Sequence, residues 1–162
     1  MFPAGCRTPR LVLRPLGDDD ADAVVSVTHH PTVISAVPFI EAPFDTDAAR
    51  DLIARNADQQ DRFYGIWLGE DRTLVGVIGV HLRDEDAVEI GYWLAPKARG
   101  QGIASEAARA MAERISTVFP DRTIIAECRP ENAASWRVLQ KAGFRDTGRP
   151  GTRPGRKLLT WQ

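Results

Sequence analysis

The feature that most constrains the fold is a glycine-bearing turn at residues 94–104, where a strand-like run passes into a helix-like one. The segment reads LAPKARGQGIA, and helical spacing of apolar residues continues from Gly102 to about Val118. The first N–H groups of a helix lack partners within the helix, and the helix dipole adds partial positive charge there. A glycine leaves room for an anion because it has no Cβ. The segment therefore predicts a phosphate-binding turn.

Two common nucleotide-binding motifs do not fit this turn. A dinucleotide-binding unit carries G-x-G-x-x-G after an early strand, and a P-loop carries G-x-x-x-x-G-K-S/T. Neither spacing occurs at these residues. Two glycines at a helix start can also serve only as turn residues, so the surrounding sequence has to distinguish a site from a turn.

Hydrophobic periodicity along the chain alternates between strand and helix. Apolar runs bounded by turn residues predict strands, and apolar residues three or four positions apart predict helices. Acidic turns at residues 69–72 and 84–87 separate three central runs, which is typical of antiparallel hairpins. We interpret residues 29–45, with their three prolines, as a loop. Strands are predicted at residues 10–15, 62–69, 73–83, 87–95, 122–128 and 157–161, and helices at 18–28, 46–60, 102–118 and 132–143. The order predicts a mixed α/β sheet.

Length, charge and cysteine content narrow the class of protein. With 162 residues and 43% hydrophobic content, the chain suits one domain over residues 1–162. Its 21 basic and 22 acidic residues give a net charge of -1, so we expect neither a nucleic-acid nor a membrane partner. Cys6 and Cys128 match no metal-ligand spacing, which indicates free thiols, no metal and a reducing compartment. Without a secretory signal or a long apolar run, a cytoplasmic location is expected.

The turn resembles the acetyl-CoA signature of the GNAT superfamily of N-acetyltransferases, Q/R-x-x-G-x-G/A. Arg99, Gly102 and Ala104 match it within the wording RGQGIA. The resemblance implies a GNAT fold, in which a mostly antiparallel sheet of about six to seven strands splays in the middle and about four helices flank it. It also implies acetyl-CoA as cosubstrate. The amides of Gln101, Gly102, Ile103 and Ala104 would then hold the pyrophosphate, with Arg99 and Gly100 shaping the loop.

Residues 128–144 resemble the family's second motif, N-x-x-S/A followed by K-x-G-F. Asn132 and Ser135 stand three apart and therefore share one face at the start of a helix. By residue type alone, Asn132 can cap this helix or bind a ligand, and the two roles are compatible. The resemblance implies that its side chain contacts the pantetheine or acetyl end of the coenzyme.

The resemblance further implies a gap between the strand ahead of the turn and the strand ahead of the second motif. In the family these two strands, here about residues 88–94 and 123–127, splay apart and the pantetheine arm enters between them. Main-chain groups bind it there, as in the addition of an extra strand. We place Tyr92, Trp93 and Leu94 at this gap. Ordinary strand packing remains an alternative for Tyr92 and Trp93.

Transfer to an amine requires a base, because a lysine-type amine is mostly protonated at neutral pH. Strand alternation puts Glu89 on one face with Gly91 and Trp93, so a carboxylate is expected among apolar neighbours. Burial disfavours the charged form of a carboxyl group and makes it a better base. Glu89 is the candidate general base, directly or through water. A glutamate on a solvated strand face is the alternative.

The departing thiolate also benefits from a proton. Many GNAT enzymes use a tyrosine one turn beyond the position of Ser135, but this chain has Leu139 there. Ser135 is therefore the candidate donor, and a hydroxyl bonded back to the main chain is the alternative. The wording EIGYW, the N-x-x-S helix and the run RLVLRPL resemble the RimJ/RimL branch, which acetylates protein N-termini among other amines.

The resemblance implies an N-acetyltransferase that moves an acetyl group from acetyl-CoA to a primary amine in a ternary complex. The acceptor would be a peptide N-terminus or a small-molecule amine, and a homodimer is possible. The rival function is a non-catalytic acyl-CoA-binding or regulatory module on the same fold. Histidine is a common acid–base residue, but we assign no role to His29, His30 or His81. We expect His81 to be half exposed in a hairpin strand.

Overall fold

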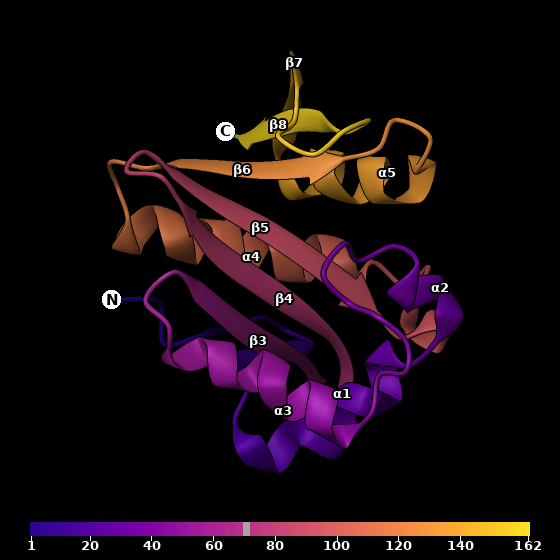
Figure 1. Ribbon diagram of the computed structural model, residues 1–162. Coiled ribbons are helices and arrows are strands. Elements are labelled where there is room, and N and C mark those ends of the chain that lie inside the picture. Colours follow the sequence, from indigo (N-terminus) through magenta and orange to yellow (C-terminus); the bar gives the residue numbers. More distant parts are fainter. Residues whose placement is uncertain (70–71) are drawn as a thin grey trace.

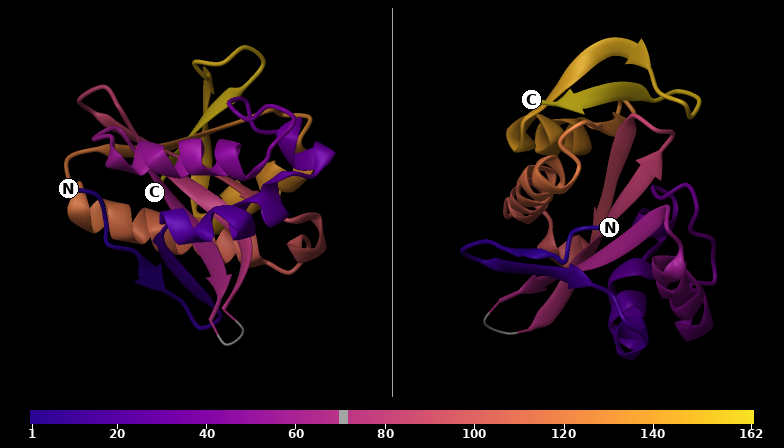
Figure 2. Two further views of the ribbon diagram at one scale, coloured as in Figure 1. Left: turned by 60° about the horizontal axis from the view of Figure 1, so that its bottom comes forward. Right: turned by 90° about the vertical axis from the view of Figure 1, so that its left-hand side faces the viewer.

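The computed structural model describes residues 1–69 and 72–162 of the chain. One mixed sheet runs through the molecule, with α1 (Ala21–Thr28) and α3 (Thr46–Ala54) on one face and α4 (Ile103–Val118) on the other (Figure 1). Figure 2 shows the same layers from two further sides. The short α2 (Pro31–Ile34) precedes α3, and α5 (Ala133–Ala142) packs beside the last strands of the sheet.

The strands are β1 (Cys6–Arg7), β2 (Leu11–Pro15), β3 (Asp61–Leu68), β4 (Thr73–Arg83), β5 (Ala87–Leu94), β6 (Thr123–Cys128), β7 (Phe144–Pro150) and β8 (Lys157–Trp161). They form an eight-stranded sheet, as far as the described residues extend, in the order β1-β2-β3-β4-β5-β6-β8-β7. Neighbouring strands are antiparallel except for β5 and β6, which run parallel. The fold is therefore a mostly antiparallel, curled α/β sheet.

Each face of the sheet is buried against its own helices. On one face, α4 contributes a stripe of buried residues at helical spacing that packs on the apolar side chains of β4 and β5. On the other face, α1 and α3 pack against Phe63, Val77 and Trp93. Because both faces are covered, the central strands are apolar on both sides and lack the alternation of a half-exposed strand.

The parallel pair β5 and β6 stays together only at its beginning. The ladder joins Ala87 to Thr123 and ends at Glu89 and Ile125, and no later pair follows in the described residues. Beyond this point β5 continues along β4 to Leu94, whereas β6 continues along β8 to Cys128. Figure 1 shows the two strands diverging. The expected splay in the middle of the sheet is confirmed.

Most of the predicted elements are present. The strands at residues 10–15, 73–83, 122–128 and 157–161 match the observed ones to within one residue, and the helices at 102–118 and 132–143 likewise. Asp45 caps α3, since its carboxylate accepts a hydrogen bond from the Ala48 amide at 2.9 Å.

Several elements differ from the predictions. Residues 29–45 are not all loop, because Pro31 occupies the first position of α2, where its fixed φ suits a helix start. The helix predicted at 46–60 ends at Ala54 and continues only as the 3₁₀ turn Arg55–Ala57. β1 and β7 were not predicted, which brings the strands above the expected six to seven. The turn predicted at 69–72 lies partly outside the described residues.

Candidate active site

The turn before α4 presents free main-chain amides. Gly100 and Gly102 have φ of 77° and 76°, values that favour glycine, and a Cβ on Gly100 would meet no atom within 4 Å. No hydrogen bond from the amides of residues 100–104 to any other described residue is present. Arg10 supports the turn from outside by donating to the Gln101 carbonyl at 2.9 Å. The turn can therefore receive an anion at the helix N-terminus.

Main-chain groups also line the gap between β5 and β6. The amide of Ala95 donates to the Val75 carbonyl at 2.9 Å. Because alternate residues of an antiparallel strand bond to the same partner, the amides of Tyr92 and Leu94 point away from β4 and toward the gap. The edge of β5 is thus open to an extended ligand directly before the turn. Trp93, the residue between them, bonds to β4 through its backbone.

The start of α5 lies across the gap from β5. The Asn132 side chain accepts a hydrogen bond from the Ser135 amide at 3.1 Å, so its capping role is confirmed. The Ser135 hydroxyl lies 2.8 Å from the Tyr92 hydroxyl, which reaches it from β5. Burial raises the pKa of Tyr92 well above its usual range, although the hydrogen bond with Ser135 acts in the opposite direction. Tyr92 is therefore a neutral hydrogen-bonding partner of Ser135.

The two aromatic residues predicted at the gap separate onto opposite faces. Tyr92 lies on the α4 side, whereas Trp93 is buried on the α1–α3 side. The indole of Trp93 donates to the Thr28 hydroxyl at 3.0 Å. Trp93 therefore connects β5 to α1, and its main-chain groups bond to β4 rather than face the gap. Leu139, at the position where a tyrosine is common in the family, is buried in the core.

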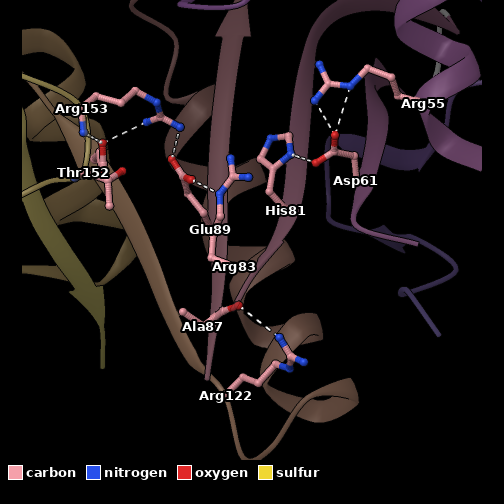
Figure 3. Close-up of polar contacts among 10 residues, drawn as sticks. Arg55, Asp61, His81, Arg83, Ala87, Glu89, Arg122, Thr152 and Arg153 are labelled. Atoms are coloured by element: carbon pink, nitrogen blue, oxygen red, sulfur yellow. Dashed lines mark hydrogen bonds and ion pairs between the residues drawn. The ribbon is translucent and has the colours of Figure 1, made fainter. Parts of the chain in front are cut away.

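Glu89 is buried, with 5% of its surface exposed, but its neighbours are not all apolar as expected. Arg83 donates to one carboxylate oxygen at 2.7 Å and Arg153 donates to the other at 2.7 Å. Figure 3 shows the carboxylate between the two guanidinium groups. Desolvation opposes the charged form of a carboxyl group, whereas hydrogen bonds from cations favour it. The prediction of a carboxylate surrounded only by apolar side chains is wrong because long arginine side chains reach it from two other segments.

Arg153 also connects Glu89 to a second buried carboxylate. It donates to Glu127 on β6 at 3.0 Å, and the Glu127 side chain is 1% exposed. Burial alone would raise the pKa of Glu127, but hydrogen bonds from Thr152 and from the Arg153 backbone and side chain lower it. The loop between β7 and β8 is thereby fastened to the sheet across the gap.

Asp61 and His81 form a buried pair on the same sheet face. His81 Nδ1 lies 2.7 Å from Asp61 Oδ1, and Arg55 donates to Asp61 Oδ2 (Figure 3). The hydrogen bond with His81 lowers the pKa of Asp61 to about 2, helped by Arg55 and opposed by burial. His81 is 4% exposed, so the expectation of a half-exposed residue is wrong, because Phe39 and Phe63 pack against its ring.

These side chains form a row across four neighbouring strands. Asp61, His81 and Glu89 are directly opposite one another in the ladders of β3, β4 and β5. We call the set the charged row; it consists of Asp61, His81, Glu89 and Glu127 with the arginines Arg55, Arg83 and Arg153.

Of the charged row, sequence reasoning found only Glu89. Its other members are separated from Glu89 by up to 64 positions and carry no motif. An acidic residue at the start of a strand, as at Asp61, and a histidine in an apolar strand, as at His81, were the available signals. Neither signal identifies a site until the strand register is known, because the register decides which residues of two strands become neighbours.

Two structural features are absent from the described residues. No helix among them is long and apolar enough to cross a membrane. Nor do residues 1–69 and 72–162 contain a group of three or more His, Cys, Asp or Glu side chains placed to hold a metal ion.

Comparisons with known proteins agree with this geometry. A family model described as "Acetyltransferase (GNAT) domain" matches residues 10–145. The chain is 32% identical over 142 residues to the uncharacterized N-acetyltransferase YnaD of Bacillus subtilis, covering 87% of this chain and 82% of that one. It is 29% identical over 110 residues to the ribosomal-protein-serine acetyltransferase of Escherichia coli, covering 65% and 60% of the two chains.

Solved structures of acetyltransferases share the fold of this chain. A GNAT-family acetyltransferase from Bacillus anthracis superposes with a TM-score of 0.83 at 28% identity, covering 96% of each chain. RimL, a ribosomal α-N-protein acetyltransferase in complex with coenzyme A, superposes with a TM-score of 0.79 at 18% identity, covering 94% and 93%. The chain belongs to the GNAT family of acetyl-CoA-dependent N-acetyltransferases.

Proposed function

We propose that this protein transfers the acetyl group of acetyl-CoA directly to a primary amine while both substrates are bound. The observation that carries the proposal is the row of unpaired amides at residues 101–104, directly beyond the open edge of β5. A diphosphate needs several convergent donors, and an extended amide-bearing arm needs a strand edge. The molecule has both, in the order in which they occur along coenzyme A.

The donor would be bound chiefly by main-chain groups. The amides of Gln101, Gly102, Ile103 and Ala104 would hold the pyrophosphate, with Arg99 and Gly100 shaping the turn. The pantetheine arm would lie along Tyr92, Trp93 and Leu94, and a backbone amide near Leu94 would polarise the thioester carbonyl. Asn132 would meet the arm from the opposite side while still capping α5.

The thiolate that leaves would take its proton from the Ser135 hydroxyl. Ser135 lies in the first turn of α5 on the gap side. The Tyr92 hydroxyl, 2.8 Å away, holds the Ser135 hydroxyl in position. Tyr92 comes from a different element than the tyrosine common in the family. Together the pair would place a hydroxyl group at the gap where Leu139 cannot supply one.

Glu89 stays a candidate catalytic residue on the acceptor face. Both of its oxygens already accept hydrogen bonds from arginines, so a direct proton transfer would have to displace one of them. Its charge can attract an acceptor ammonium without such a change. Replacing Glu89 with Gln tests this role. If Glu89 is the base, its removal should change both the transfer rate and the pH profile of that rate.

The acceptor we propose is a protein N-terminus or a small-molecule amine. The sequence likeness to the ribosomal-protein-serine acetyltransferase supports the first of these. Thiol release from acetyl-CoA, measured with serine-ended and alanine-ended hexapeptides and with spermidine, would identify the class. Release with none of them, together with tight CoA binding, would favour the non-catalytic acyl-CoA-binding module.

Calorimetry with a matched pair of glycine variants tests the donor site. Gly102 and Gly148 have φ of 76° and 73°, so alanine costs each about 1 kcal/mol in the left-handed region. Gly102→Ala also adds a Cβ beside the proposed pyrophosphate and should weaken CoA binding about tenfold, or about 1.4 kcal/mol. Gly148→Ala, on β7, should leave CoA affinity unchanged. Equal affinity in both variants, or no heat from the wild type, would overturn the proposed donor site.

A further inference from the structure

On the α1–α3 face of the sheet, the space above Gly91 is open, next to the gap, and we call this space the hollow. Gly91 lies on β5 between Glu89 and Trp93 on the same face, and a Cβ there would meet no atom within 4 Å. Glu89 is the last residue of β5 that pairs with β6, so the outer flank of Gly91 borders the gap. A group in this hollow would approach a thioester in the gap from the face opposite α4.

The imidazole of His81 lies on the other flank of the hollow. Gly79 is directly opposite Gly91 in the β4–β5 ladder. A Cβ on Gly79 would come within 2.6 Å of His81 Nε2, so the ring is folded over Gly79 and its Nε2 lies beside the hollow. A pair of glycines in register thus leaves room for the histidine ring on β4 and for a ligand on β5.

The hydrogen bond with Asp61 determines which nitrogen of His81 is free. Because the pKa of Asp61 is lowered to about 2, its carboxylate is ionised at neutral pH and can only accept. His81 Nδ1 therefore carries the hydrogen in the 2.7 Å contact, and in the neutral ring Nε2 carries the lone pair. Nε2 has no hydrogen-bond partner in the described part of the chain.

His81 differs in this respect from Glu89, the other titratable group at the hollow. Both oxygens of Glu89 are bonded to arginines at 2.7 Å, whereas His81 retains an unoccupied basic nitrogen. Phe39 stands over the region, with its ring centroid 6.3 Å from that of His81 and 6.0 Å from that of Trp93, and is 42% exposed. An exposed aromatic ring therefore lies beside both His81 and Trp93, the residues that flank the hollow.

We propose that the acceptor amine binds in the hollow at Gly91 and that His81 Nε2, oriented by Asp61, removes its proton. The proposal rests on the proposed acetyl transfer and names the base for it. Glu89, paired with Arg83 and Arg153, borders the other end of the hollow. His81 is the catalytic residue and Asp61 is a positioning residue.

Two protons leave the acceptor nitrogen during the transfer. An acceptor ammonium gives one proton to His81 Nε2, and the neutral nitrogen forms a bond to the thioester carbonyl carbon. The carbon–sulfur bond breaks, and the thiolate takes a proton from the Ser135 hydroxyl. The second proton that the nitrogen loses passes through solvent and restores the Ser135 hydroxyl. The products are the acetamide, the free thiol and a proton that His81 returns to solvent.

Charged groups surround His81 on this face of the sheet. Asp61 and Glu89 face it as anions, from β3 and β5, and Arg55, Arg83 and Arg153 balance them. The acidic limb of kcat/KM for the acceptor should contain the ionisation of His81 in addition to that of the amine itself. The amine contributes equally to every variant, so a comparison of variants isolates the histidine.

The test uses His81→Gln, Asp61→Asn and Glu89→Gln with whichever of the two hexapeptides or spermidine gives the fastest thiol release. His81→Gln should lower kcat about a hundredfold or more. It should also remove the contribution of the histidine from the acidic limb of the kcat/KM profile. The affinity for CoA should stay within twofold of the wild type. Asp61→Asn should lower kcat less. In His81→Ala, added imidazole should restore part of the rate, which a purely structural histidine would not permit.

Gly91→Ala tests the hollow separately. The added Cβ meets no protein atom, so folding and CoA affinity should be unchanged, while KM for the acceptor rises at least tenfold. Unchanged kcat and pH profile in His81→Gln, or unchanged KM in Gly91→Ala, would overturn the inference while leaving acetyl transfer intact. A wild type that binds CoA but releases no thiol with any acceptor would instead remove the proposed function, and the inference with it.

Discussion

The two sides of the gap differ in the kind of chemical group that they present. On the α4 side, the turn at residues 100–104 and the edge of β5 offer bare main-chain amides. On the α1–α3 side, the charged row offers buried side chains that are mutually paired. Main-chain recognition tolerates many side chains as long as the backbone conformation is kept, whereas a paired side-chain network depends on each of its members. The donor side should therefore respond mildly to single substitutions and the acceptor side strongly.

The largest expected effect on stability is at the centre of the charged row. Arg153→Met removes the cation that bonds to both Glu89 and Glu127 and leaves buried carboxylate oxygens without that partner. Losing one partner of a buried ion pair is strongly destabilising, and we expect about 3 kcal/mol less free energy of unfolding at pH 7.

Urea unfolding measures this loss, with Arg149→Met as the matched control. Arg149 is exposed on β7, and its guanidinium has no partner among the residues that the structure describes. The control should change stability by less than about 0.5 kcal/mol. Equal stability of the two variants would contradict the view that the charged row is an interdependent network.

A smaller effect is expected from acid. The pKa of Asp61 is lowered from 3.8 to about 2, so its contribution to stability is complete above pH 3.8 and is lost as the pH falls through 2. Between pH 5 and pH 2 this residue should account for about 2 kcal/mol of lost stability. Asp61→Asn should flatten the stability curve by that amount, whereas Asp47→Asn, at an exposed site, should not. A curve for Asp61→Asn parallel to that of the wild type would contradict the assignment.

On the donor side, the hydroxyl pair should matter for turnover more than for binding. Ser135→Ala removes the proposed proton donor but keeps the helix cap, and should lower kcat about tenfold, near the lower limit for acid–base catalysis because a thiolate leaves readily. Tyr92→Phe, which removes the hydroxyl 2.8 Å away, should have a smaller effect in the same direction. Ser116→Ala, at the far end of α4, is the control. Full activity in Ser135→Ala would remove Ser135 from the mechanism.

The smallest effect separates two roles of one residue. Asn132→Ala and Asp45→Ala each remove a side-chain N-cap, of α5 and of α3, and each should cost about 1 kcal/mol of stability. If Asn132 also binds the coenzyme, its variant alone should bind CoA more weakly, by about threefold to tenfold in calorimetry. Identical CoA affinities would make Asn132 a cap only.

The same contrast explains what could be predicted from sequence. The strands and helices around the gap carry their periodicity locally, and the turn at residues 94–104 carries its phosphate-binding signature in two glycines one residue apart. Both could be predicted because one short segment contains the whole signal. β7 could not, since FRDTGRP is exposed along most of its length and contains a glycine and a proline. β1 is only two residues long, and it forms a strand only by pairing with β2. So short a segment carries no periodicity.

The acceptor side could be predicted only in fragments. Strand alternation correctly puts Glu89 on a face with Gly91, but nothing near it in sequence predicts that Arg153 bonds to it. The pairing of Asp61 with His81 follows from a ladder between β3 and β4 whose register is decided by packing across the whole sheet. Tyr92 shows the same limit, because its hydroxyl meets Ser135 only where two distant elements approach.

The central claim is that the amides of residues 101–104 and of Tyr92 and Leu94 are open to the donor. A titration of the uniformly ¹⁵N-labelled protein with CoA, followed by amide NMR, tests it directly. We predict that these amide resonances shift together with one saturation curve, while those of β7, such as Arg145, stay in place. Shifts confined to other segments, or none at CoA concentrations that saturate binding, would contradict the account.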